Sequence, residues 1–145
     1  MMSRWLSEFG DLDVADHTAV FNLAIAALND GTVKTLRIPG VSLTVNGTFT
    51  VNRSGAQIIG DFAQITQLGS CDTFVFSPAD PVTQLINDVV LSGITVVGPP
   101  APTGGRALAL IRVANGMFPN LWFKNVFQGV DIVSDIPEAN GGDVG

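Results

Sequence analysis

Short runs of alternating apolar and polar residues, each followed by turn-forming residues, occupy most of the chain after position 35. In the first run Leu36 and Ile38 flank Arg37, and Gly40 follows. A period of two indicates a strand with one buried face, and Gly and Asn favour the turns between strands. We therefore expect strands at 36–38, 43–45, 49–51, 57–60, 64–68, 73–76, 88–91, 93–97, 108–113, 121–123, 125–127 and 129–133. So many short strands favour an all-β architecture.

Residues 18–28 have a different period, that of a helix. The apolar stripe at spacings of three and four consists of Phe21, Ala24, Ile25 and Leu28. A side-chain oxygen of Asp16 or Thr18 can cap the first turn, and Gly31 can end the helix in the left-handed conformation. The sequence therefore predicts one helix ahead of the strands.

Two internal matches relate the strands to one another. Residues 90–96 match 122–128 in residue type at a shift of 32, with Gly93 and Asn125 at the equivalent turn position. Leu36 and Ile58 are related by a shift of 22. Unequal shifts with similar strand cores are typical of stacked coils with loops inserted at one corner. The matches therefore favour a solenoid over a sandwich of hairpins.

Several segments between residues 16 and 61 resemble the opening of the pectate-lyase-like right-handed parallel β-helix superfamily. They are Asp16-His17-Thr18-Ala19, Asn29-Asp30-Gly31, Leu36-Arg37-Ile38-Pro39, Val45-Asn46-Gly47-Thr48-Phe49-Thr50-Val51 and Ala56-Gln57-Ile58-Ile59-Gly60-Asp61. The resemblance extends more loosely over 88–134. It implies an all-β fold, a right-handed single-stranded parallel β-helix with an N-terminal capping α-helix.

The chain is expected to divide into two parts. Residues 1–15 show no sustained period and read as an N-terminal arm or anchor. Residues 16–145 would hold the capping helix and the first coils. Because residues 135–145 contain neither an amphipathic helix nor a closing polar coil, we expect the β-helix to be incomplete at its C-terminal end, or covered there by a partner subunit.

Composition excludes several function classes. Seven Lys and Arg against thirteen Asp and Glu give a net charge of −6, which argues against nucleic-acid binding. No apolar run approaches the roughly 18 residues of a membrane span. With one cysteine, Cys71, and one histidine, His17, no metal site and no cofactor are expected. Residues 1–10 lack the apolar core of a secretory signal, so we expect a virion tail location, with an extracellular one as the alternative.

The catalytic candidates are acidic residues near the end of the chain. Glycoside hydrolysis needs one carboxyl group as proton donor and a second as nucleophile or base. Asp131, Asp135 and Glu138 form the late acidic cluster beside a strand, although a solvated acidic loop is the alternative interpretation. If Val130 and Ile132 face inward, Asp131 faces solvent. The Asn-Thr-Asp, Gly-His-Gly and Arg-x-Lys signatures of polygalacturonase-like members are absent, so the resemblance implies that any catalytic site lies mostly outside these residues.

Exposed aromatic residues are the binding candidates. Alternation with Leu121 and Phe123 places Trp122 on the outer face, where it could stack on a sugar or pack against a neighbouring subunit. Trp5 and Phe9, four residues apart, could dock a short helix into a groove on another protein. They are the predicted particle anchor.

The resemblance and the missing signal together predict the N-terminal part of a phage tailspike or tail-fibre protein. Such a protein would be a homotrimer, would bind another virion tail protein through its arm, and would contribute to recognition or depolymerisation of a host surface polysaccharide. One alternative is a bacterial polysaccharide lyase or glycoside hydrolase of the β-helix class. A second is a structural β-solenoid without catalysis.

Overall fold

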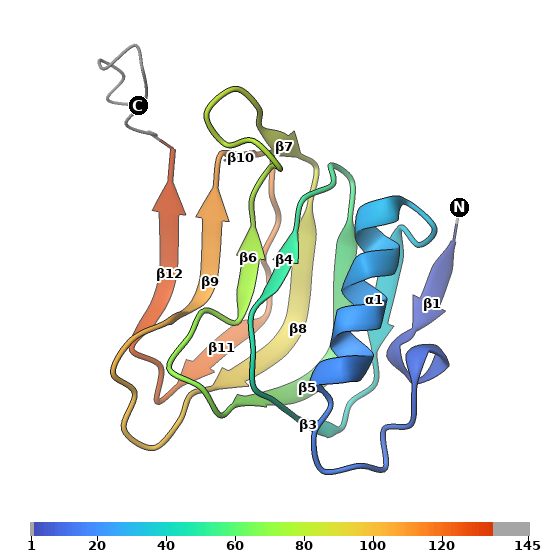
Figure 1. Ribbon diagram of the computed structural model, residues 1–145, viewed down its shortest axis with the longest axis vertical. Helices are drawn as coiled ribbons and strands as arrows, with labels where there is room; N and C mark the ends of the chain where they lie inside the picture. Colours follow the sequence, from blue (N-terminus) through green and yellow to red (C-terminus); the bar gives the residue numbers. More distant parts are fainter. Residues whose placement is uncertain (1, 135–145) are drawn as a thin grey trace.

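The computed structural model describes residues 2–134, which form one α-helix, one 3-10 helix and short parallel strands (Figure 1). Along the chain the elements are β1 (Ser3–Trp5), η1 (Leu6–Phe9), α1 (Thr18–Asp30), β2 (Thr35–Ile38), β3 (Ser42–Val45), β4 (Phe49–Val51), β5 (Gln57–Gln67), β6 (Phe74–Phe76), β7 (Ile86–Asn87), β8 (Val90–Val97), β9 (Arg106–Ile111), β10 (Val113–Ala114), β11 (Leu121–Lys124) and β12 (Gln128–Val133).

All strand pairings in this described range are parallel. The largest sheet has the order β1-β2-β5-β8-β11, with β3 also paired to β5. A second sheet has the order β12-β9-β6-β4, and β10 and β7 form a third. In the largest sheet Leu36 lies beside Ile58, and Ile58 beside Leu91. All three side chains are fully buried, so equivalent positions stack into apolar columns.

Helix α1 packs its apolar stripe into the same core as the strands. The ring of Phe21 lies 5.0 Å from that of Phe49 on β4 and 6.5 Å from that of Phe74 on β6, centroid to centroid. All three phenylalanines are buried. In Figure 1 the helix runs beside β4 at one end of the molecule. It therefore closes that end of the apolar columns.

The helix boundaries follow from local chemistry. Gly31 has φ of 83°, and its N–H donates to the carbonyl of Leu28, so the predicted left-handed end is confirmed. His17 occupies the cap position at the other end, without a side-chain cap bond. Oδ1 of Asp16 instead accepts from the N–H and the hydroxyl of Thr18, at 2.9 and 2.6 Å. Asp16 thus satisfies one N–H of the first turn, as predicted.

The predicted fold class is wrong. The structure is mixed α/β, with about 13% helix and 43% strand, and its parallel strands fall into several small separate sheets. Neither a solenoid nor a closed barrel is present within residues 2–134, and an all-β right-handed single-stranded parallel β-helix is not shown. A period of two fixes which face of a strand is buried and says nothing of how sheets join. The helix also belongs to the core itself, which the all-β class leaves out.

The two internal matches have different outcomes. The shift of 22 is confirmed, because Leu36 pairs with Ile58. The shift of 32 is wrong: Leu121 pairs with Ile94, a shift of 27 (121 − 94). Asn120 and Asn125 are both candidates for the turn position beside Gly93. Asn120 (φ 58°), whose carbonyl accepts the N–H of Gly93, takes that place. Asn125 (φ 53°) lies beside Gly98 instead, and residues 125–127 form no strand.

The segment expected to be an arm is joined to the rest of the fold. β1 pairs in parallel with β2, where Arg4 lies beside Leu36. Leu6 in η1 is fully buried, and Phe9 packs against the core. Residues 3–9 therefore contribute an edge strand and apolar contacts.

The opposite end of the molecule presents apolar residues. Val130 and Ile132 on β12 pair with Leu108 and Leu110, both buried. Val130 and Ile132 nevertheless remain 44% and 71% exposed. They continue the inward-facing columns at the last strand, and no further strand covers them in the described part of the chain.

Candidate ligand-binding face

The outward face of the largest sheet carries three exposed aromatic residues, Trp5, Phe62 and Trp122, and we call it the outer aromatic face. Trp122 is 48% exposed on β11, between Leu121 and Phe123, which both pack against the core. The predicted outward orientation of Trp122 is therefore confirmed.

Phe62 is the unusual member of this face. It sits where β5 bends, between Ile59 and Ala63, at a register shift against β8. Its φ of 58° lies in the left-handed region, its side chain is 71% exposed, and its ring centroid is 6.1 Å from that of Trp122. A bulky residue at positive φ is strained, and such strain is concentrated at functional sites.

The bend places Phe62 because two glycines meet there. A Cβ on Gly60 would lie 2.4 Å from the carbonyl oxygen of Gly93. Only glycines allow β5 and β8 to approach this closely while both turn. Phe62 follows Gly60 by two residues, so the bend directs its ring outward beside Trp122.

A hollow of about 250 Å³ lies beside Trp5 on the same face. Trp5, Arg37 and Asp61 line it. Nε of Arg37 donates to Oγ of Ser3 at 3.1 Å, which orients the guanidinium. The hollow thus offers hydrogen-bond donors from Arg37 and acceptors from Asp61 next to an indole ring.

The predicted anchor residues Trp5 and Phe9 lie on different elements. Trp5 is on β1 and is 44% exposed. Phe9 ends η1, where the guanidinium of Arg4 lies 4.7 Å from its ring centroid and pairs with Glu8. Phe9 also packs against the core, so of the two Trp5 presents the larger surface to a partner. A particle-anchoring role for them stays a prediction.

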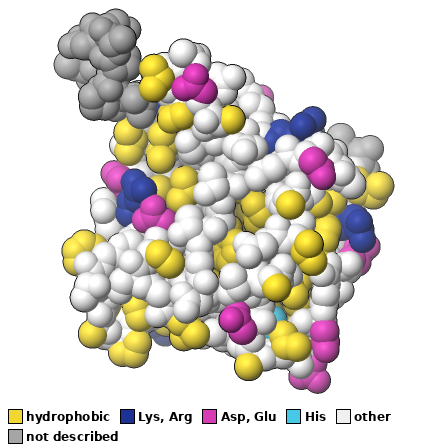
Figure 2. Space-filling view, in the orientation of Figure 1, with side chains coloured by type: hydrophobic (Ala, Val, Ile, Leu, Met, Phe, Trp, Pro, Cys, Tyr) yellow, Lys and Arg dark blue, Asp and Glu magenta, His cyan; other side chains and the backbone are white. Residues whose placement is uncertain are grey.

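The catalytic candidate Asp131 belongs to a charged cluster. Arg106 contacts Asp131 at 2.9 Å and Asp72 at 2.6 Å. Figure 2 shows a basic side chain flanked by acidic ones on the side of β9 and β12. The hydrogen bonds that Arg106 donates to Asp72 lower the pKa of Asp72, and those that it donates to Asp72 and, to a smaller extent, to Asp131 raise the pKa of Arg106. Asp72 is therefore charged at neutral pH and cannot act as a proton donor.

The other two catalytic candidates, Asp135 and Glu138, lie outside the described residues. Within residues 2–134, no group of three or more His, Cys, Asp or Glu side chains could hold a metal ion. No helix in that range is long and apolar enough to cross a membrane.

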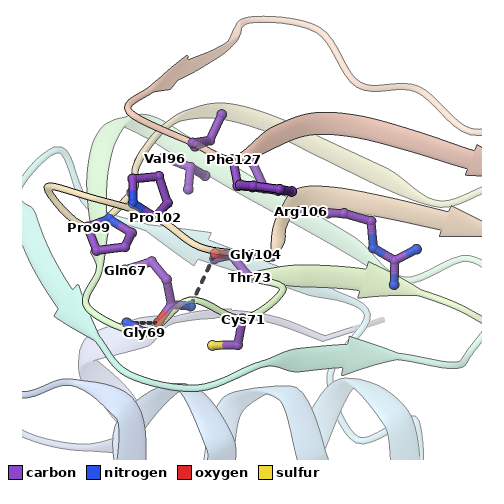
Figure 3. A pocket seen from close by; sticks show the side chains of 14 residues that line it. Gln67, Gly69, Cys71, Thr73, Val96, Pro99, Pro102, Gly104, Arg106 and Phe127 are labelled. Carbon is purple, nitrogen blue, oxygen red and sulfur yellow. Dashed lines mark hydrogen bonds between the residues drawn. The ribbon is translucent and has the colours of Figure 1, made fainter.

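A second hollow beside Cys71 is almost filled. Figure 3 shows Gln67 beside Gly69 among the lining residues, and its buried amide donates to Gly47 O and Thr73 Oγ1 at 2.8 and 3.1 Å. The remaining volume of about 10 Å³ holds at most about one water molecule. Cys71 is partly exposed. These residues hold loops together and form no ligand site.

Sequence reasoning missed Phe62, Arg37 and Asp61. The expected strands ended at Gly60 and resumed at Gln64, so the intervening residues received no role. An aromatic residue in a turn segment two residues after a glycine was the available signal. Comparison with protein-family models, with curated proteins and with solved structures found no match.

Proposed function

We propose that the outer aromatic face binds polysaccharide, and that the chain is part of a tailspike-like or tail-fibre-like virion protein that recognises a host surface glycan. Sugar rings present C–H groups on their faces and hydroxyls on their edges. Exposed indole and phenyl rings can stack on the C–H groups, and Arg37 and Asp61 can form hydrogen bonds with the hydroxyls.

The exposed and strained Phe62 beside Trp122 carries this proposal. Exposure of an aromatic ring and a left-handed backbone both disfavour phenylalanine at this position, where Gly or Asn would fit. Nothing in the fold requires the ring, since it points away from the core. A ligand that stacks on Phe62 and Trp122 would explain why phenylalanine occupies this position.

The arrangement of the face favours an extended ligand. Trp5 and Trp122 stand on β1 and β11, four strand spacings apart in the sheet order and on opposite sides of the bend in β5, so at least about 20 Å separates them. The hollow next to Trp5 and the pair of Phe62 and Trp122 are separate contact points. An oligosaccharide can reach both, whereas a single small molecule cannot.

Depolymerisation, if the complete particle performs it, is proposed to use residues other than the charged cluster. A retaining or inverting mechanism requires a carboxyl group that is protonated when the reaction begins. Asp72 is held as a carboxylate by Arg106, and Asp131 shares the same guanidinium. The cluster joins β6, β9 and β12 and supports the sheet.

Fluorescence tests the proposal, because Trp5 and Trp122 are the two tryptophans and the chain has no tyrosine. Capsular and pectic polysaccharides are titrated into the Trp5→Phe variant, in which Trp122 is the remaining tryptophan and therefore the fluorescence reporter. A saturable change that Phe62→Ala weakens at least tenfold is expected. Leu23→Ala, at an exposed position on α1, is the matched control and should leave binding unchanged. Equal binding by Phe62→Ala and the control would refute the stacking role.

A further inference from the structure

A cavity of about 460 Å³ opens where α1 ends, between Gly31, the start of β2 and the turn at residues 53–56. In Figure 1 this region lies at the end of the molecule where α1 and β1 meet the loop before β2. Its volume falls in the range of small-ligand sites. It is separate from the outer aromatic face and shares no lining residue with the hollow beside Trp5.

The cavity is positive in an otherwise acidic chain. Lys34 and Arg53 line it, and none of its lining residues is Asp or Glu. Among the residues that the structure describes, neither cation has an ion-pair partner within 4.0 Å. The whole chain has seven Lys and Arg side chains and a net charge of −6. Two cations that line one cavity without a lining carboxylate are therefore a local exception to the acidic character of the chain.

One acidic residue lies near the cavity, and it is already engaged. Hydrogen bonds from the Thr32 side chain and backbone, with a smaller contribution from the charge of Arg53, lower the pKa of Asp30. The Thr32 N–H donates to Oδ1 of Asp30 at 2.8 Å. The Asp30 carboxylate accepts a hydrogen bond within its own turn, so Lys34 and Arg53 remain available to a ligand.

The guanidinium of Arg53 lies against the end of α1. A Cβ on Gly31 would lie 2.6 Å from Cζ of Arg53, so the guanidinium rests on the glycine backbone. The carbonyl end of a helix favours a cation at this point. Gly31 therefore serves both the left-handed end of the helix and the close approach of Arg53. An oriented guanidinium can bind a carboxylate with two hydrogen bonds.

The remaining lining is suited to a sugar ring. Met2, which is 50% exposed, is the accessible apolar side chain of the lining, whereas Leu28, Val33 and Ala56 are at most 2% exposed. Oγ of Ser54 accepts the N–H of Asn87 at 3.1 Å, which leaves its hydroxyl hydrogen free to donate. An inorganic anion would use the cations and leave the apolar part empty.

We propose that this cavity binds a carboxylated sugar residue, with its carboxylate on Lys34 and Arg53 and a ring face against Met2. The site would give the protein a preference for acidic over neutral glycans. It stands on its own contacts and does not depend on the outer aromatic face.

The test is an NMR titration of the full chain with sodium glucuronate, followed through the backbone amides. Shifts at Lys34, Arg53 and Gly55 that saturate and weaken with added salt are expected. Arg53→Gln and Lys34→Gln should each weaken binding at least fivefold. Arg112→Gln makes the same charge change at a cation outside the cavity and should not weaken it. Thermal unfolding of each variant verifies that the fold is kept.

Several results would overturn the proposal. If glucose bound as tightly as glucuronate, the carboxylate would have no role. If inorganic phosphate bound as tightly as glucuronate, the sugar ring would have no role. Unchanged affinity in both Arg53→Gln and Lys34→Gln would exclude the cavity. Trp122→Ala separates the two proposals, since it should weaken polysaccharide binding on the outer aromatic face and leave glucuronate binding intact.

Discussion

Nη2 of Arg106 lies 2.6 Å from Oδ2 of Asp72, a residue 34 positions earlier in the chain. Arg106 begins β9, and Asp72 lies in the loop that leads into the neighbouring β6. Oδ1 of Asp72 also accepts the backbone N–H of Arg106 at 2.8 Å. One carboxylate thus fixes both the side chain and the backbone at the start of a strand.

Asp72→Asn should lower the free energy of unfolding at pH 7 by about 1 kcal/mol, since the pair is partly solvated. The pKa of Asp72 is lowered in the folded protein, so its stabilisation is present above the unfolded value of about 3.9 and is lost as the pH falls below it. Urea unfolding at pH 7 and pH 3 measures this. The variant should differ from the parent at pH 7 and approach it at pH 3. Asp13→Asn, an exposed control, should show no difference at pH 7.

Buried His17 is expected to carry a proton on Nε2 and to be structurally important. Its Nδ1 accepts the N–H of Thr44 at 3.0 Å, and its Nε2 lies 2.9 Å from the carbonyl of Leu12, which requires the proton on Nε2. His17→Leu leaves the Thr44 N–H without this acceptor and should destabilise the protein by about 1–3 kcal/mol. Urea unfolding measures the loss, and imidazole ¹⁵N shifts report the tautomer. A proton on Nδ1 at neutral pH would contradict the assignment.

Phe62 should show opposite effects on stability and binding. Phe62→Asn places a residue that tolerates the left-handed region at φ 58°, and should stabilise the fold by about 0.5–1 kcal/mol. Phe62→Ala retains a Cβ at the same φ and should give no such gain. Both variants should lose polysaccharide affinity. Thermal unfolding beside the fluorescence titration measures the two effects, and a destabilised Phe62→Asn would show that the ring supports the fold.

The bend at Gly60 and Gly93 should tolerate no side chain. At Gly93, where φ is 70°, a Cβ would lie 2.0 Å from the carbonyl oxygen of Gly60. Gly93→Ala should therefore destabilise by about 2–4 kcal/mol, through both the clash and the backbone conformation. Gly104→Ala is the control, because the nearest atom to its Cβ would be 3.7 Å away. Equal unfolding midpoints for the two variants would contradict the close approach.

The sequence predicted local structure well and long-range arrangement poorly. The stripe from Phe21 to Leu28 predicted α1, and alternation predicted the buried faces, including the outward position of Trp122. Each of these depends on neighbours a few residues away. The choice between Asn120 and Asn125 opposite Gly93 depends on contacts between distant strands, and both asparagines adopt the same backbone conformation.

The candidate sites were harder to predict for the same reason. Phe62 and Trp122 lie side by side only because β5, β8 and β11 pair in the observed register. Lys34 and Arg53 line the same cavity only because the turn at 53–56 lies beside the start of β2. Residue type and alternation identified Trp122, whereas the partners in each site depend on strand pairings that the sequence does not reveal.

The exposed end of the second sheet gives a final prediction. Ile132 pairs with Leu110 in the same inward-facing column, yet Ile132 is 71% exposed and Leu110 is 6% exposed. Leu110→Ala should destabilise by about 2–4 kcal/mol, because it removes a packed side chain. Ile132→Ala should change the unfolding free energy by no more than about 0.5 kcal/mol, as at other exposed positions.

Urea unfolding at several protein concentrations, with light scattering, measures both variants. A loss at Ile132 that grows with protein concentration would show that another copy covers this face, as the predicted homotrimer could. A large loss that is independent of concentration would contradict the exposure of Ile132, because burial within one chain is what makes truncation of an isoleucine costly.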